Sequence, residues 1–150
     1  MKEPYLYILM RTDLPSMGAG RAAAQASHAA SAFAKKYGHT KEYKEWAGET
    51  TQGFGTAIVL GVTNDRMGEI HKAAFHQKFA TEQIIDPDYA IVVSSEVAQF
   101  LDKNLSGIKI EPSEKDPTKV IIHRQEITCA YVFGEKEKLS ELLGGLPLYS

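Results

Sequence analysis

Short apolar runs alternate with longer amphipathic segments along this 150-residue chain. The short runs, rich in isoleucine, valine and tyrosine, favour strands, whereas apolar residues recurring every three to four positions favour helices. The predicted strands are 5–10, 56–61, 80–86, 120–124 and 128–134, with 90–93 either a further strand or a continuation of 80–86 beyond Pro87. Three predicted helices are 41–47, 95–104 and 135–143. A fourth runs from Gly20 or Arg21 to 36, and a fifth begins at 64–65 and includes 75.

This order of elements indicates the fold class. Strands that alternate with helices predict a layered α/β domain, and right-handed crossovers place helices on both sides of the sheet. We therefore expect a three-layer α/β/α fold with a mixed sheet of four to five strands. We expect a single domain over 1–150, with 48–55 a loop and 107–118 a polar loop or irregular edge.

Composition limits the class of protein. With 43% hydrophobic and 24% charged residues, the chain is expected to be one soluble domain with a proper core. No run approaches the ~20 apolar residues of a membrane span, and 1–4 lead into a strand without a secretory signal. We expect a cytoplasmic protein with no membrane partner. The single cysteine, Cys129, excludes an internal disulfide and is expected to be a small buried residue.

Charge is unevenly distributed around the net value of −2. Residues 1–85 hold ten lysines and arginines against eight acidic residues, whereas 86–150 hold seven against eleven. We therefore expect any anion-binding face on the amino-terminal half. Candidates for that face are Arg11, Arg21, Lys35, Lys36, Arg66 and Lys72.

The loop after the first strand leads directly into an alanine-rich helix. Pro15, Gly18 and Gly20 mark the turn. The first N–H groups of a helix lack partners and carry partial positive charge, so this corner can receive a phosphate or a developing oxyanion. Arg21, Gln25 and His28 are spaced i, i+4 and i+7, which places them within a ~60° arc of one helix face. The pattern alone also fits a tightly packed helix with a structural histidine.

A second polar position follows the strand 80–86. Ligands of α/β sheets bind where loops leave the carboxyl ends of strands, and the loops after Met10 and Asp86 emerge there. We expect one cleft to contain Asp13, Arg21, Gln25, His28 and Asp86. The alternative is that Asp86 is an Asp-Pro turn residue that merely ends a strand.

Strong signatures of other enzymes are absent. There is no Gly-x-Ser-x-Gly, no His-Glu-x-x-His and no Gly-Lys-Ser/Thr loop. The five histidines are scattered, so no metal site is expected.

Several segments resemble the type 2 peptidyl-tRNA hydrolase family. The match begins in 7–33 with Arg11-Thr12-Asp13-Leu14, Met17-Gly18-Ala19-Gly20-Arg21 and Ala23-Ala24-Gln25-Ala26-Ser27-His28-Ala29-Ala30. It continues with Trp46 and Gly48, the strand 56–60, Gln83-Ile84-Ile85-Asp86, 129–134 and Leu143-Gly144-Gly145-Leu146-Pro147-Leu148-Tyr149. The family usually reads Met-Gly-Lys-Gly-Lys at the loop, then a small pair, Ala-Gln, two residues and His-Ala.

The chain departs from the family pattern at three places. Arg21 stands where the family has lysine, and the two cations are not interchangeable at a precise site. Asp86 is followed by Pro87-Asp88-Tyr89-Ala90 instead of a small residue, Gly, Arg or His, and Thr. An inserted segment at about 90–127 adds roughly thirty residues to the compact family pattern.

The resemblance implies hydrolysis of the ester between a peptide and the 3′-terminal ribose of tRNA, without a cofactor. It implies tRNA as partner and makes a homodimer a candidate assembly. We expect Asp86 to orient or deprotonate water, Arg21 to stabilise the oxyanion or a phosphate, and Gln25 and His28 to hydrogen-bond the ester or ribose. Asp13 is expected to position Arg21. The expected substrate-binding residues are Asp13, Gly18, Gly20 and Arg11.

Two other functions fit the same residues. One is a non-catalytic module that binds tRNA ends, a nucleotide or a protein, with Tyr89, Phe54 or Trp46 stacking on bases if they are exposed. The other is a hydrolase of small acyl esters whose pocket is narrowed by 90–127.

Overall fold

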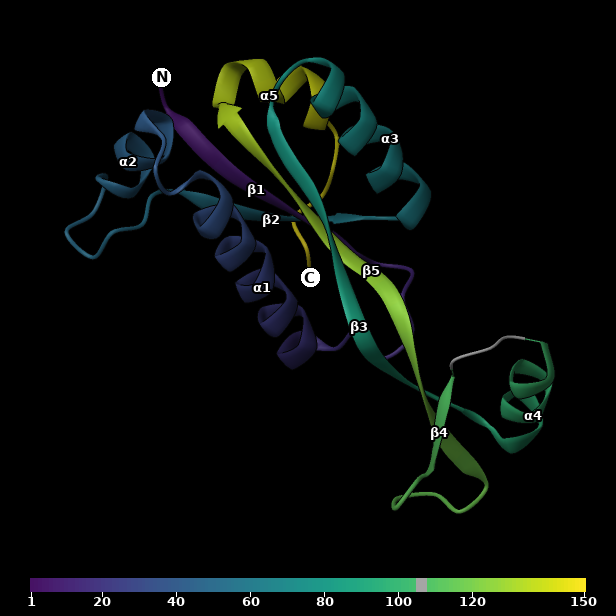
Figure 1. Ribbon diagram of the computed structural model, residues 1–150. Coiled ribbons are helices and arrows are strands. Elements are labelled where there is room, and N and C mark those ends of the chain that lie inside the picture. Colours follow the sequence, from purple (N-terminus) through teal and green to yellow (C-terminus); the bar gives the residue numbers. More distant parts are fainter. Residues whose placement is uncertain (105–107) are drawn as a thin grey trace. The chain divides into compact units, whose positions relative to one another are not determined.

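The computed structural model describes residues 1–104 and 108–150, and Figure 1 shows the arrangement of the elements. Within those ranges, the helices are α1 (Ala19–Tyr37), α2 (Lys41–Ala47), α3 (Asn64–His76), α4 (Ser95–Asn104) and α5 (Lys136–Leu143). The strands are β1 (Pro4–Arg11), β2 (Ala57–Val62), β3 (Ala80–Ser94), β4 (Lys109–Pro112) and β5 (Lys119–Glu135).

The strands differ from the prediction more than the helices do. The segment 80–94 is one 15-residue strand that runs through Pro87, and the two strands expected at 120–124 and 128–134 form one 17-residue strand. β3 ends the strand order β2-β1-β5-β3, and an edge strand tolerates proline because not every N–H is needed for pairing. Part of the expected polar loop forms β4, which pairs with β5, while Gly107 lies outside the described residues.

The chain divides into two compact units. The core unit comprises Met1–Asp13, Met17–Ile84 and Thr128–Ser150. The extension unit comprises Leu14–Ser16 and Ile85–Ile127, and it contains the segment 90–127 that the sequence marks as an insertion. β3 and β5 each contribute residues to both units.

The core unit is a three-layer α/β/α structure, as predicted. β1 pairs in parallel with β2 and antiparallel with β5, which makes the sheet mixed. Side chains alternate between the two faces of a strand, so Leu6, Ile8 and Met10 of β1 share a face, which packs against α1 and α2. The opposite face is covered by α3 and α5, through buried residues that include Met67 and Leu139 (Figure 1).

Aromatic rings fill the layer between α1, α2 and the sheet. Phe33 of α1 is fully buried. Its ring centroid lies 4.7–5.7 Å from those of Tyr37, Tyr43, Trp46, Tyr131 and Phe133. Aromatic pairs at such separations stabilise a core beyond the area they bury. Phe33 therefore joins both helices of this layer to β5.

Replacing Phe33 tests its central position. We expect Phe33→Ala to lower the free energy of unfolding by about 3–5 kcal/mol, because the change leaves a cavity among five rings. Phe75→Ala is the matched control, since Phe75 is 63% exposed and surface truncations change stability by only about 0.5 kcal/mol. Urea unfolding followed by circular dichroism measures both. Equal losses of unfolding free energy in the two variants would contradict the central position of Phe33 in the core.

Candidate active site at the start of helix α1

Helix α1 begins at Ala19, one residue before the earliest predicted start. Gly18 is its N-cap, no side chain caps the helix, and its first turn holds no acidic residue. The first hydrogen bond of the helix runs from the Ala22 N–H to the Gly18 carbonyl. The N–H groups of Ala19, Gly20 and Arg21 precede that bond and point out of the helix start, a geometry that favours anions.

The two glycines of this corner keep the backbone accessible. A Cβ atom at Gly18 or Gly20 would meet nothing within 4 Å. Crowding therefore does not require glycine at either position, and neither residue has a positive φ. What both provide is a backbone that a ligand can approach closely. Their predicted role in substrate binding stays a prediction.

A pocket of about 520 Å³ opens beside this helix start. Its walls come from the small-residue face of α1, from β2 and from the segment that follows α5. The lining includes Met17, Gly18, Ala23, Ala26, Val59 and Tyr149. The lining is mainly apolar, so the pocket can accept an apolar or aromatic group beside the helix start.

The segment 147–149 forms one wall of this pocket by lying along β2. The Gly61 N–H donates to the Pro147 carbonyl at 2.9 Å, and the Tyr149 N–H donates to the Val59 carbonyl at 3.0 Å. The Tyr149 hydroxyl donates to the Met17 carbonyl at 3.2 Å. Tyr149 thus joins the edge of the sheet to the loop before α1.

Gln25 faces the sheet, whereas Arg21 and His28 are exposed. Gln25 is 4% exposed, and its Oε1 accepts a hydrogen bond of 2.7 Å from the hydroxyl of the fully buried Thr128. His28 Nδ1 lies 3.4 Å from the same Oε1. The structure therefore brings Gln25 and His28 together, and it adds Thr128, which sequence analysis assigned only to a strand. No signal in the sequence pairs positions 103 residues apart.

Cys129 is confirmed as a buried residue. Burial raises the pKa of its thiol to about 12, and the thiol donates to the Gln25 carbonyl. The reactive thiolate is therefore disfavoured at neutral pH.

Arg11 and Asp13 form an internal ion pair rather than an open anion site. Arg11 is 8% exposed, and its Nε donates to Asp13 Oδ1 at 2.9 Å. The Asn64 N–H, at the start of α3, donates to Asp13 Oδ2 at 3.1 Å. Partial burial alone would raise the pKa of Asp13, but hydrogen bonds from Arg11 and Asn64 hold it below its ordinary value. Asp13 thus contacts Arg11 and Asn64, and its expected positioning of Arg21 stays a prediction.

Asp86 belongs to the extension unit. It lies inside β3, and its Oδ1 accepts a hydrogen bond of 3.0 Å from the Asp88 N–H. This is the local geometry of an Asx turn around Pro87. The strand continues past it, so Asp86 does not end a strand. Its convergence with Arg21, Gln25 and His28 stays a prediction.

Two of the three aromatic residues considered for base stacking are buried. Trp46 lies in the core, where its indole N–H donates to the Thr56 carbonyl at 2.8 Å. Tyr89 is buried and donates to the Pro15 carbonyl at 3.1 Å. Only Phe54 of the three is exposed, at 51%, so it alone can stack on a base without rearrangement.

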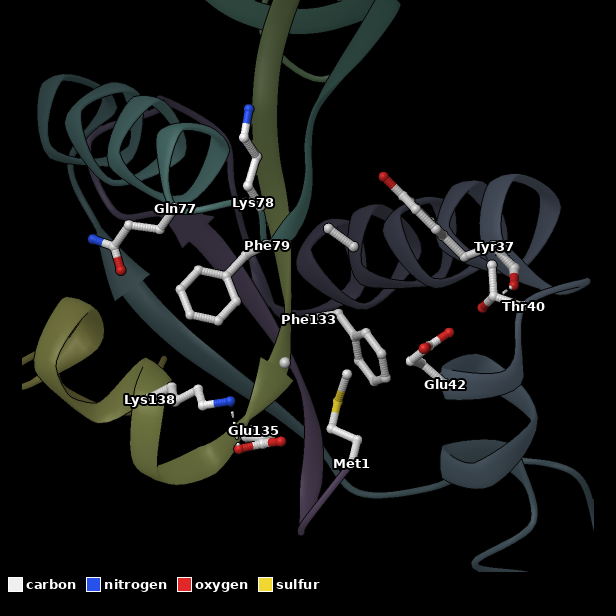
Figure 2. A pocket seen from close by; sticks show the side chains of 12 residues that line it. Met1, Tyr37, Thr40, Glu42, Gln77, Lys78, Phe79, Phe133, Glu135 and Lys138 are labelled. Carbon is white, nitrogen blue, oxygen red and sulfur yellow. Dashed lines mark hydrogen bonds and ion pairs between the residues drawn. The ribbon is translucent and has the colours of Figure 1, made fainter.

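A second cavity, of about 510 Å³, lies at the end of the core unit where β1 begins and β5 ends. Figure 2 shows the rings of Phe79 and Phe133 beside it, with the Lys138–Glu135 ion pair at one side. Lys78 and Glu42 add one charge of each sign to its lining. None of the predicted site residues lines this cavity.

The comparisons with known proteins assign the family. A sequence model of the family "Peptidyl-tRNA hydrolase PTH2" matches residues 5–149. The chain therefore belongs to the peptidyl-tRNA hydrolase PTH2 family. A search of curated proteins gives no match. Among solved structures, a protein of unknown function from Agrobacterium tumefaciens strain C58 is similar, at a TM-score of 0.55 and 11% identity over 100% of both chains. That likeness supports the fold alone.

Residues 1–104 and 108–150 contain neither a membrane-spanning helix nor a cluster of metal-ligating side chains. No helix there is both long and apolar enough to cross a membrane. No group of three or more histidine, cysteine, aspartate or glutamate side chains is placed to hold a metal ion.

The Asp13 ion pair should make stability depend on pH. Because the folded-state pKa of Asp13 is lowered, its contribution is present above the unfolded value of about 3.9 and is lost as pH falls through the folded value. We expect Asp13→Asn to lower stability at pH 7 by about 1 kcal/mol, a modest figure because solvent screens the carboxylate. The difference from wild type should shrink toward pH 2.

Thermal melts at several pH values measure this effect. Glu69→Gln is the matched control, because it removes a carboxylate from an exposed 2.9 Å pair with Arg66 and should change stability by less than about 1 kcal/mol. An Asp13→Asn deficit of equal size at pH 7 and pH 2 would rule out the charge as its cause.

Proposed function

We propose that this protein hydrolyses the ester bond of peptidyl-tRNA, releasing the peptide and free tRNA without a cofactor. The observation that carries the proposal is the family match over residues 5–149, which spans both the corner at α1 and Asp86. The substrate is an N-substituted aminoacyl-tRNA. It would place the protein with the translation machinery of the cytoplasm, and a homodimer remains a candidate assembly.

The α1 corner supports binding of the charged end of the substrate. The first turn of the helix has no acidic residue, and it carries the exposed Arg21. These groups suit a terminal phosphate or the oxyanion of a tetrahedral intermediate. The adjacent 520 Å³ pocket suits an apolar side chain of the peptide or the terminal base.

The reaction needs one base and one oxyanion site. In our scheme Asp86 accepts a proton from a water molecule as the water oxygen bonds to the ester carbonyl carbon. Arg21 and the N–H groups at the helix start stabilise the negative charge on the carbonyl oxygen. The bond from that carbon to the ribose 3′ oxygen then breaks, and the proton on Asp86 passes to the departing oxygen. The products are a carboxylic acid and the ribose hydroxyl.

Gln25 and His28 have different roles in this scheme. Gln25 is buried against Thr128, which supports a positioning role that holds α1 at a fixed depth on β5. His28 is exposed beside it, so it can hydrogen-bond the ester or the ribose.

A binding module without hydrolysis is the second candidate. The observation that favours it is the segment Pro87-Asp88-Tyr89-Ala90, which replaces the residues that follow the family's aspartate. Tyr89 is buried there. Binding of tRNA without turnover would select this alternative, and turnover of small N-acyl esters but not of charged tRNA would select an esterase of altered specificity.

Substitution of the proposed base and cation tests the scheme. With N-acetylated aminoacyl-tRNA as substrate, we expect Asp86→Ala to lower kcat/KM by about 10²–10⁴-fold and Arg21→Ala by about 10²–10³-fold. Arg21→Lys should retain or raise the rate, since it restores the family's residue. Lys44→Ala, at an exposed cation of α2 outside the candidate anion-binding face, is the matched control. Full activity of Asp86→Ala, or release by wild type no faster than in buffer, would overturn the proposal.

Filling the apolar pocket tests whether substrate occupies it. Ala23 lines the pocket, whereas the neighbouring Ala24 does not and is also exposed on α1. We expect Ala23→Leu to raise KM by about tenfold, the cost of roughly 1.4 kcal/mol of lost binding. Ala24→Leu should leave KM unchanged. Identical KM values for the two variants would remove the pocket from the substrate site.

A further inference from the structure

A chain of polar contacts leads from Asp86 to a histidine of the extension unit. The Asp88 N–H donates to Asp86 Oδ1 at 3.0 Å, and Asp88 Oδ1 lies 3.1 Å from His123 Nδ1. On the other side of the ring, His123 Nε2 lies 3.2 Å from Glu111 Oε2, with which it forms a hydrogen bond. Lys109 Nζ lies 2.7 Å from Glu111 Oε1. All five residues belong to the extension unit.

Three strands bring these residues together. Asp88 lies on β3, His123 on β5, and Glu111 and Lys109 on β4. The register of β4 on β5 places Lys109 opposite His123 and Glu111 opposite Ile121. Because side chains alternate along a strand, Glu111 and His123 share one face and interact diagonally. Residues of the inserted segment therefore contact the turn that carries Asp86.

The His123 ring lies between two carboxylates. Its side chain is 16% exposed, and both ring nitrogens face a carboxylate oxygen. Nδ1 is buried and has no hydrogen bond within the described residues, so its 3.1 Å approach to Asp88 Oδ1 is a polar contact without hydrogen-bond geometry. On the other side of the ring, an ionised carboxylate can only accept, so Nε2 is the donor to Glu111 Oε2.

Charged side chains surround the ring. Lys109 and the His123 ring face the carboxylates of Glu111 and Asp88. Hydrogen bonds from Lys109 and from His123 hold the pKa of Glu111 below its usual value, so Glu111 is ionised at neutral pH. On the same strand as His123, Arg124 pairs with Glu126 at 2.9 Å.

We infer that His123 is a positioning residue for the reaction, because its ring lies between Asp88 and Glu111 and so holds the turn that orients the Asp86 carboxylate. The inference rests on the proposed function, in which Asp86 is the base. It also gives the inserted segment a role, since β4 and the adjoining part of β5 supply the side chains that hold this turn.

Steady-state kinetics test this role. We expect His123→Gln and Asp88→Asn to lower kcat by about tenfold or more, because a small misplacement of a catalytic group costs up to about 10²-fold. KM should remain within roughly twofold, since neither residue contacts substrate in this scheme. His39→Gln, at an exposed histidine, is the matched control and should keep the wild-type kcat.

A measurement that does not require activity separates this inference from the proposed function. In ¹⁵N NMR spectra, the resonance of the Asp88 amide, which donates to Asp86, should differ from that of wild type in His123→Gln but not in His39→Gln. Asp88→Asn guards against loss of folding, because Asp88 is 69% exposed and tolerates the change.

The outcomes distinguish the two claims. If Asp86→Ala abolishes hydrolysis while His123→Gln keeps the wild-type rate and the wild-type Asp88 amide shift, the positioning role is wrong and the proposed function stands. If Asp86→Ala retains hydrolysis, the proposed function is wrong, and the Asp88 amide still decides whether His123 holds the turn.

Discussion

Burial of both faces of β1 is the constraint on which the core unit depends. Every residue from Leu6 to Arg11 is buried, with neighbouring strands on both sides and helices over both faces. Such a strand cannot shift in register without moving apolar side chains to the wrong layer. The point where the chain leaves β1 is therefore fixed, and so is the start of α1 above it. The candidate site is built on the most constrained element of the fold.

Sequence patterns predicted the helices well because helical signals are local. The bounds of α2 and α4 agree with the prediction to the residue, and α1 begins one residue earlier than expected. Thr40 and Thr63 cap α2 and α3 through their side chains, which is the kind of short-range signal that a sequence carries. The lengths of β3 and β5 depend on pairing between distant residues. A break between strands was therefore expected at Pro87 and at the polar pair Gln125-Glu126, whereas β3 and β5 continue through these residues.

The candidate site was predictable in part for the same reason. The spacing of Gln25 and His28 placed them on one helix face, and the structure brings them into contact. Thr128, which hydrogen-bonds to Gln25, could not be identified, because only tertiary pairing joins them. Arg11 was counted among surface cations, yet it is buried beside Asp13 at the start of α3. A cation near an anion-binding loop can stabilise the fold through an internal ion pair instead of binding a ligand. Burial of its side chain distinguishes the structural role from the binding role.

The segment 147–149 also covers the outer edge of the sheet. β2 is the last strand on its side, and bare edges are templates on which other chains can add strands. Hydrogen bonds from Gly61 to Pro147 and from Tyr149 to Val59 occupy that edge. The same tyrosine forms a wall of the pocket beside α1. A ligand large enough to displace Tyr149 would uncover that edge and leave it open to strand addition by another chain.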